Sequence, residues 1–235
     1  MPISKNDVVA LFSDPALSQI NFTVADIPVN AREFQNVSDY IKNDDIPVIT
    51  GPTAGMAYYD RKSNKLETDP ASNLPLTLGD RALILHECVH AIVDIRELQE
   101  LSLTDEIAAY IAQLTYMQVK SPSPNHPRAV AIPRNNPLAL FVMSVLDVID
   151  QYKLTSKEGL GARINHFDVV VLSQRLRAVA QYASISLEAK EDPKFSGVSI
   201  KDGGIRALRA AIRNARRAPR EIDLLPWPVY SRKIF

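Results

Sequence analysis

The chain has 235 residues, of which 46% are hydrophobic, and its 27 lysine and arginine residues balance its 27 aspartate and glutamate residues. This composition is that of an ordinary globular protein, and the neutral net charge points to no particular partner. Cys88 is the only cysteine, which excludes an intrachain disulfide. The length predicts one domain over residues 1–235, which can divide into lobes at 1–100 and 101–235.

Short helical and strand-like patterns alternate in the N-terminal part of the chain. We expect helices at 5–12 and 31–43 and strands at 20–25 and 46–50. Two further strand-like runs, 56–60 and 65–69, are separated by a short polar connection, which predicts a β-hairpin.

Longer helical patterns dominate the rest of the chain. Thr77 and Asp80 form a start signal for a helix that continues to about Leu98, and a second helix is expected from 102–104 to 119. Five prolines between 121 and 137 predict a long loop. Further helices are expected at 137–152, 166–184 and 204–217. The sequence therefore predicts a mainly helical α+β fold with a small sheet and hairpin in its N-terminal half.

Residues 86–90 read His-Glu-Cys-Val-His, the HExxH pattern. On a helix this spacing places His86 and His90 one turn apart on one face, where both can bind a tetrahedral zinc ion beside Glu87. The surrounding segment 82–95 is apolar almost all the way round, so this helix is expected to be buried. Buried polar groups cost free energy unless they find partners, and a metal ion would satisfy all three residues.

Catalytic zinc commonly has three protein ligands. The longer pattern HExxHxxGxxH would supply the third ligand nearby, but Val93 and Arg96 occupy its glycine and final histidine positions, which excludes it. The hairpin, the HExxH helix and a following helix with an acidic residue resemble the zincin metallopeptidases, specifically their glutamate-ligand branch, the gluzincins. The resemblance covers about residues 56–119.

This resemblance implies a zincin-like fold and zinc as the cofactor. It implies that His86, His90 and Glu106 are the zinc ligands, and that Glu87 is the general base that activates a water molecule. The interval from His90 to Glu106 is shorter than in the best-known gluzincins, which leaves Asp105 as a rival third ligand.

Further residues are candidates for supporting roles. Tyr110 is the leading candidate for stabilising the transition state, because it lies one turn after Glu106. Asp94 can orient a histidine or can be an ordinary surface carboxylate. The resemblance also implies that the strand Lys65–Asp69 is a sheet edge that pairs with extended substrate, with an ordinary edge strand as the alternative. More distant candidates for the stabilising role are Tyr58, Tyr59, His126 and His166.

The predicted function is therefore hydrolysis of peptide bonds, in a peptide or protein substrate, by a zinc metallopeptidase. The alternative is a catalytically silent zincin-like module or secreted effector domain that binds metal and recognises a partner. The arginine-rich helix at 204–217 is interpreted as a solvated face, so no nucleic-acid partner is expected. No membrane span is expected, and the N-terminus lacks a signal-peptide pattern, which favours a cytoplasmic location or export without a cleavable signal.

Overall fold

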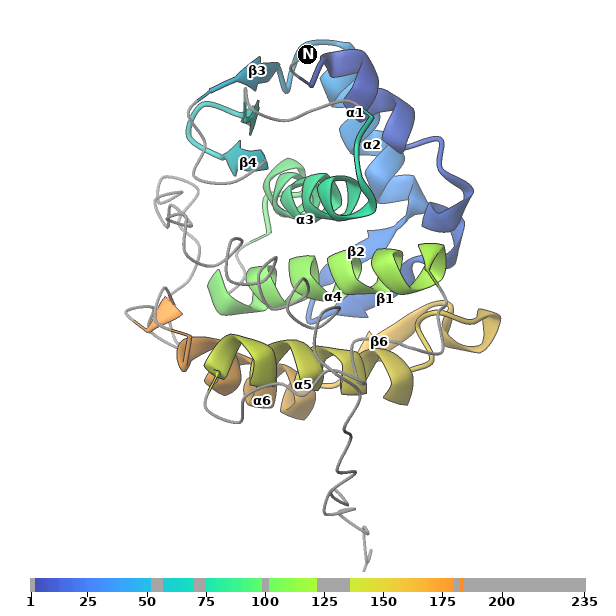
Figure 1. Cartoon of the computed structure of the whole chain (residues 1–235), viewed down its shortest axis with the longest axis vertical. Helices are drawn as coiled ribbons and strands as arrows, with labels where there is room; N and C mark the ends of the chain where they lie inside the picture. The colour runs from blue at the N-terminus through green and yellow to red at the C-terminus, as the bar shows by residue number, and fades with distance from the viewer. Residues whose placement is uncertain are drawn as a thin grey trace, which may run out of the picture.

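The computed structural model describes residues 3–51, 57–69, 75–98, 102–121, 136–179 and 182–183. This part of the chain contains six α-helices and two three-stranded sheets, which confirms the mainly helical α+β class (Figure 1). None of the described helices is long and apolar enough to cross a membrane. The single domain over 1–235 stays a prediction, because residues 184–235 lie outside the described part.

The first sheet combines an N-terminal hairpin with a strand from far along the chain. Its order is β2-β1-β6, with β1 (Asn21–Val24) antiparallel to β2 (Ile27–Asn30) and parallel to β6 (Ala162–Ile164). The predicted strand at 20–25 corresponds to β1. Neither β2 nor β6 is predicted by the sequence pattern, because both are short and depend on pairing with β1.

The two N-terminal helices pack against each other, and the second of them contacts β2. α1 (Lys5–Leu11) and α2 (Ala31–Lys42) agree with the predicted helices to within about one residue, the usual uncertainty of a helix end. The Asn30 side chain begins α2 by accepting hydrogen bonds from the backbone N–H groups of Arg32 and Glu33. A 3₁₀ turn, η1 (Pro15–Gln19), connects α1 to β1.

The predicted hairpin forms part of the second sheet, whose order is β3-β5-β4. It comprises β3 (Val48–Thr50), β4 (Ala57–Asp60) and β5 (Lys65–Thr68). β5 pairs with β3 on one side and with β4 on the other, so it is the central strand. The prediction that Lys65–Asp69 is the substrate-pairing edge is therefore wrong, because β3 already occupies the second side of that strand.

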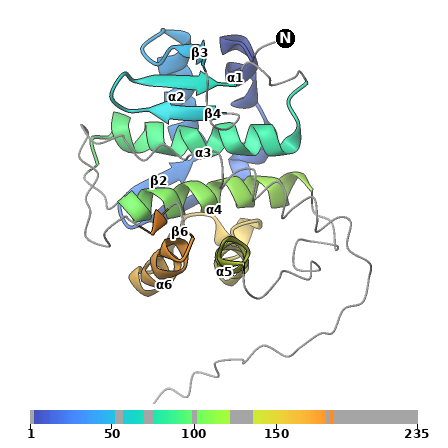
Figure 2. The same cartoon turned by 60° about the vertical axis from the view of Figure 1, so that its left-hand side comes forward.

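The HExxH helix and the helix after it form the centre of the molecule. α3 (Leu78–Ile95) starts with the predicted capping box of Thr77 and Asp80, and α4 (Ser102–Lys120) follows after a short connection. The two helices run antiparallel and side by side, with the hairpin sheet on one side and two further helices on the other (Figure 2). This sandwich explains why α3 is buried almost all the way round, as its sequence predicts.

The two further helices are α5 (Pro137–Gln151) and α6 (His166–Arg177). A 3₁₀ turn, η3 (Lys157–Gly159), and β6 lie between them. α5 agrees with the predicted helix at 137–152, whereas α6 ends seven residues before the predicted end at 184. Most of the predicted loop at 121–137 and the whole predicted helix at 204–217 lie outside the described residues.

Candidate metal centre

The HExxH residues project from the middle of α3 into the protein interior. His86 and Glu87 are each 1% exposed and His90 is 8% exposed. The two imidazole rings lie 5.1 Å apart, centroid to centroid, as expected for residues one turn apart on a helix. Three polar side chains are therefore packed among apolar residues, where each needs a specific partner.

The third member of the cluster comes from the first turns of α4. The Nε2 atom of His86 lies 3.6 Å from Oε2 of Glu106, and Nε2 of His90 lies 3.8 Å from Oε1 of the same carboxylate. All the candidate ligand atoms lie within 4.8 Å of one another. Tetrahedral ligands about 2.1 Å from zinc are about 3.4 Å apart, so this cluster has nearly the dimensions of a zinc site.

The hydrogen bonds behind the two histidines orient their Nε2 atoms toward this cluster. Nδ1 of His86 lies 3.1 Å from Oε1 of Gln113, and Nδ1 of His90 lies 2.8 Å from Oδ2 of Asp105. Both partners are oxygen acceptors, so each Nδ1 donates its hydrogen to them and each Nε2 faces the cluster, where the neutral form of the ring can bind a metal ion. Nε2 of His86 is buried and has no hydrogen-bond partner among the described residues. A cation satisfies such converging acceptors, whereas another acceptor could not.

The charges around the cluster favour a divalent ion. Glu87, Asp105 and Glu106 contribute three carboxyl groups, and among the described residues Arg61 pairs with one of them, Asp105, so acidic groups outnumber that guanidinium. Burial by itself lowers the pKa of His90, but the nearby Asp105, Glu106 and Glu87 outweigh it and raise that pKa to about 10. The site therefore attracts positive charge strongly.

Asp105, the rival ligand, lies behind His90 instead of facing the cluster. Its Oδ2 atom accepts hydrogen bonds from Nδ1 of His90 and from the Arg61 guanidinium. Burial raises the pKa of Asp105, but the positive charges of His90 and Arg61 reverse this and hold it below its usual value. The geometry thus brings Glu106 together with the histidines and places Asp105 as the carboxylate that orients one of them.

Glu87 is held by the edge strand β4. Its Oε2 atom accepts a hydrogen bond of 3.0 Å from the backbone N–H of Tyr59, and its Oε1 atom has no partner within the described part of the chain. Burial raises the pKa of Glu87, and the two histidines and the Tyr59 N–H oppose this effect. One carboxylate oxygen is therefore anchored while the other remains available to accept a proton.

Tyr110 packs against the site, but another tyrosine reaches the candidate ligand. The ring of Tyr110 stands edge-on to His86 at 4.8 Å, and its hydroxyl lies 3.1 Å from the hydroxyl of Tyr182. The Tyr182 hydroxyl donates to Oε2 of Glu106 at 3.2 Å. Burial raises the pKa of Tyr110, so its hydroxyl stays protonated. Sequence reasoning missed Tyr182, since no motif links it to a residue 76 positions earlier.

Two residues near the end of α3, Asp94 and Arg96, contact other elements of the fold. Asp94 accepts a hydrogen bond of 2.7 Å from the Tyr59 hydroxyl, so its described contact is with β4 and not with a histidine. Arg96, at the position that excludes the longer motif, forms a forked pair with Glu33 of α2.

The more distant candidates fall into three groups. Tyr58 lies beside Tyr59 in β4, and burial together with the charges of Asp60 and Glu87 raises its pKa to about 12. His166 is exposed at the start of α6. His126 lies outside the described residues.

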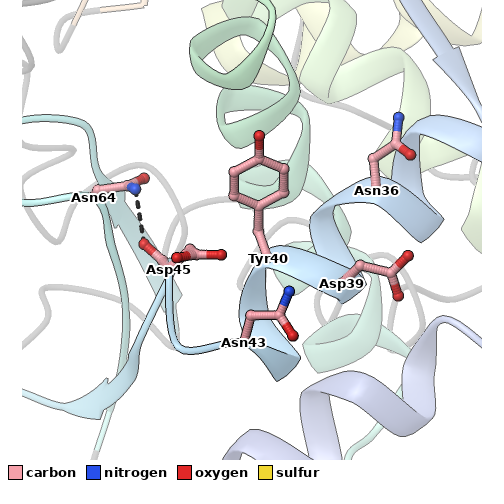
Figure 3. A pocket seen from close by; sticks show the side chains of 6 residues that line it. All are labelled: Asn36, Asp39, Tyr40, Asn43, Asp45 and Asn64. Carbon is pink, nitrogen blue, oxygen red and sulfur yellow. Dashed lines mark hydrogen bonds between the residues drawn. The ribbon is translucent and has the colours of Figure 1, made fainter.

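A polar cavity of about 580 Å³ lies apart from the cluster, between α2 and the β4–β5 turn (Figure 3). Its lining contains none of the candidate metal ligands and is formed by Asn36, Asp39, Tyr40, Asn43, Asp45 and Asn64. The Asn64 side chain closes one side by donating to the backbone carbonyl of Asp45 at 2.8 Å.

Comparison of the chain with protein-family models, with curated proteins and with solved structures finds no match.

Proposed function

We propose that the protein is a zinc-dependent metallopeptidase, with His86, His90 and Glu106 as the metal ligands. The observation that carries the proposal is the convergence of two imidazole Nε2 atoms and a carboxylate at ligand spacing. The Nδ1 hydrogen bonds to Gln113 and Asp105 support it, because they leave both Nε2 atoms facing the same point.

Zinc favours this set of two nitrogen ligands and one oxygen ligand, and when bound it lowers the pKa of water and polarises a carbonyl group. Glu87 is the side chain that transfers the proton in the proposed reaction. Its free Oε1 atom takes a proton from the attacking water, while the Tyr59 N–H holds the other oxygen in place. Glu87 then passes the proton to the leaving amine.

The position of β4 supports a peptide as the substrate. β4 is the outer strand of the described sheet and lies against α3, and an extended peptide can add to such a strand through backbone groups other than the Tyr59 N–H, which holds Glu87. The Tyr182 hydroxyl donates to Glu106 and lies 3.1 Å from the Tyr110 hydroxyl, so this pair of tyrosines helps to hold the carboxylate ligand in place.

The decisive experiment compares the full chain with its Glu87→Gln variant. We expect both to bind about one zinc per chain, and we expect cleavage of a denatured protein or a broad peptide library to fall by at least about 100-fold in the variant, because the proton acceptor is lost. Glu97→Gln is the matched control, since Glu97 is an exposed residue after the end of the same helix. Bound zinc without any Glu87-dependent cleavage would contradict the peptidase and favour a silent metal-binding module.

A further inference from the structure

Arg61 occupies an unusual position for a residue in a hairpin turn. It lies in the connection between β4 and β5, next to the exposed residues Lys62 and Ser63, yet only 6% of its side chain is exposed. Burial of a guanidinium is costly unless the charge is paired. Here the partner is the equally buried Asp105 of α4.

The geometry of the Arg61–Asp105 pair links it to His90, because both residues contact the same carboxylate. Arg96 and Glu33 show the ordinary structural arrangement, in which a guanidinium fork donates to both carboxylate oxygens. At Asp105, by contrast, Oδ2 accepts from both Arg61 and His90, while Oδ1 accepts from no described residue. One oxygen atom thus joins the hairpin turn to the ring of a candidate metal ligand.

We propose that Arg61 is a positioning residue for metal binding, which acts through Asp105 to hold the His90 ring with Nε2 toward the metal centre. The inference rests on the metal site of the proposed function, but not on peptidase activity. The same hairpin also holds Glu87 through the N–H of Tyr59, so one element positions both a ligand and the base.

The test is the zinc affinity of the full chain, measured by competition with a chromophoric chelator at one fixed pH. We expect Asp105→Asn to weaken zinc binding by about 10- to 100-fold, as loss of such a partner does in other zinc sites. Arg61→Met should weaken it by about 10-fold, and the double variant should be about as weak as Asp105→Asn alone, because the two residues act in series. Lys62→Met is the matched control and should bind zinc like the wild type.

Three results would overturn the inference. The first is an unchanged zinc affinity in Arg61→Met, even with a loss of stability against urea in the metal-free protein, since that would make Arg61 a structural tether only. The second is a double variant in which the two losses multiply. The third is a wild type that binds no zinc, which would also end the peptidase proposal, whereas tight zinc binding without cleavage would end that proposal alone.

A conservative variant keeps the test decisive if Arg61→Met does not fold. Arg61→Lys retains the charge but loses the planar fork, and we expect its zinc affinity to fall by about threefold or more. An affinity equal to that of the Lys62→Met control would overturn the inference.

Discussion

Each candidate histidine ligand is oriented by a different acceptor. Gln113 accepts from His86 with a neutral amide, whereas Asp105 accepts from His90 with a carboxylate. Both acceptors lie on α4, so the helix that supplies Glu106 also sets the orientation of both rings. We therefore expect Gln113 and Asp105 to affect the zinc affinity although neither is one of the three candidate ligands.

The contribution of Gln113 can be measured directly. Gln113→Leu removes the acceptor at nearly constant volume, and we expect zinc affinity to fall by about 10-fold because the His86 ring loses its fixed orientation. Gln118→Leu, later on the same helix, is the control and should leave the affinity unchanged. Equal affinities in the two variants, again from chelator competition, would show that Gln113 does not orient the site.

The sequence identifies the candidate ligands at this scale but not the residues that support them. His86, Glu87 and His90 share one local motif, and the structure brings Glu106 to them. Gln113 lies 27 positions from the histidine that it contacts, and glutamine in a helix is too common to carry a signal. Such partners are selected by the packing of two helices, which no single-chain pattern encodes.

Helix ends and helix contacts determine how the elements are held together. The capping box at Thr77 starts α3 as its residues predict, and the pair of Arg96 with Glu33 ties the end of α3 to α2. Glu33 is 3% exposed, and the hydrogen bonds from Arg96 hold its pKa below the usual value despite burial. This contact joins two helices and includes none of the candidate metal ligands.

The pair predicts a pH-dependent contribution to stability. A carboxylate with a lowered pKa in the folded state stabilises the fold above its unfolded pKa, near 4.3, and loses that contribution as the pH falls through the folded value. We expect Arg96→Met to lower the free energy of unfolding by about 1–2 kcal/mol at pH 7, because the buried Glu33 carboxylate loses its partner. The difference from wild type should shrink as the pH falls below about 4.

Urea unfolding of the metal-free chain from pH 7 down to pH 3.5 or so measures this difference. Arg163→Met is the matched control, since Arg163 pairs with Asp26 on the surface, where such pairs are worth little. A loss in Arg96→Met that stays constant over the whole range would show that packing, not charge, accounts for the contact.

The candidate metal centre lies where the layers of the molecule meet. α3 and α4 supply the candidate ligands, the hairpin sheet supplies Tyr59 and Arg61, and Tyr182 follows α6 (Figure 2). Without a bound cation these layers bring together the buried carboxyl groups of Glu87, Asp105 and Glu106, and the repulsion between them opposes their packing. A divalent ion should therefore stabilise the whole fold as well as enable chemistry.

Thermal unfolding should report this stabilisation. Zinc at about 100 times its dissociation constant stabilises the native state by about 2.7 kcal/mol, which raises the Tm of a chain of this size by roughly 5–10 °C over the chelator-treated protein. Glu106→Gln should show a much smaller rise, and Mg²⁺ should have little effect, because histidine nitrogens favour zinc. Equal zinc-induced shifts in wild type and Glu106→Gln, measured by calorimetry, would remove Glu106 from the ligand set.

The long helices, the α3 cap and the HExxH face depend on local periodicity and short-range hydrogen bonds. The sequence by itself therefore predicts them. The central place of β5, the position of Asp105 behind His90 and the approach of Tyr182 to Glu106 do not follow from it. Each depends on contacts between segments 15 to 76 residues apart. Those contacts form only when the apolar faces of distant segments pack together. The local sequence pattern does not specify which segments meet, so the tertiary packing determines it.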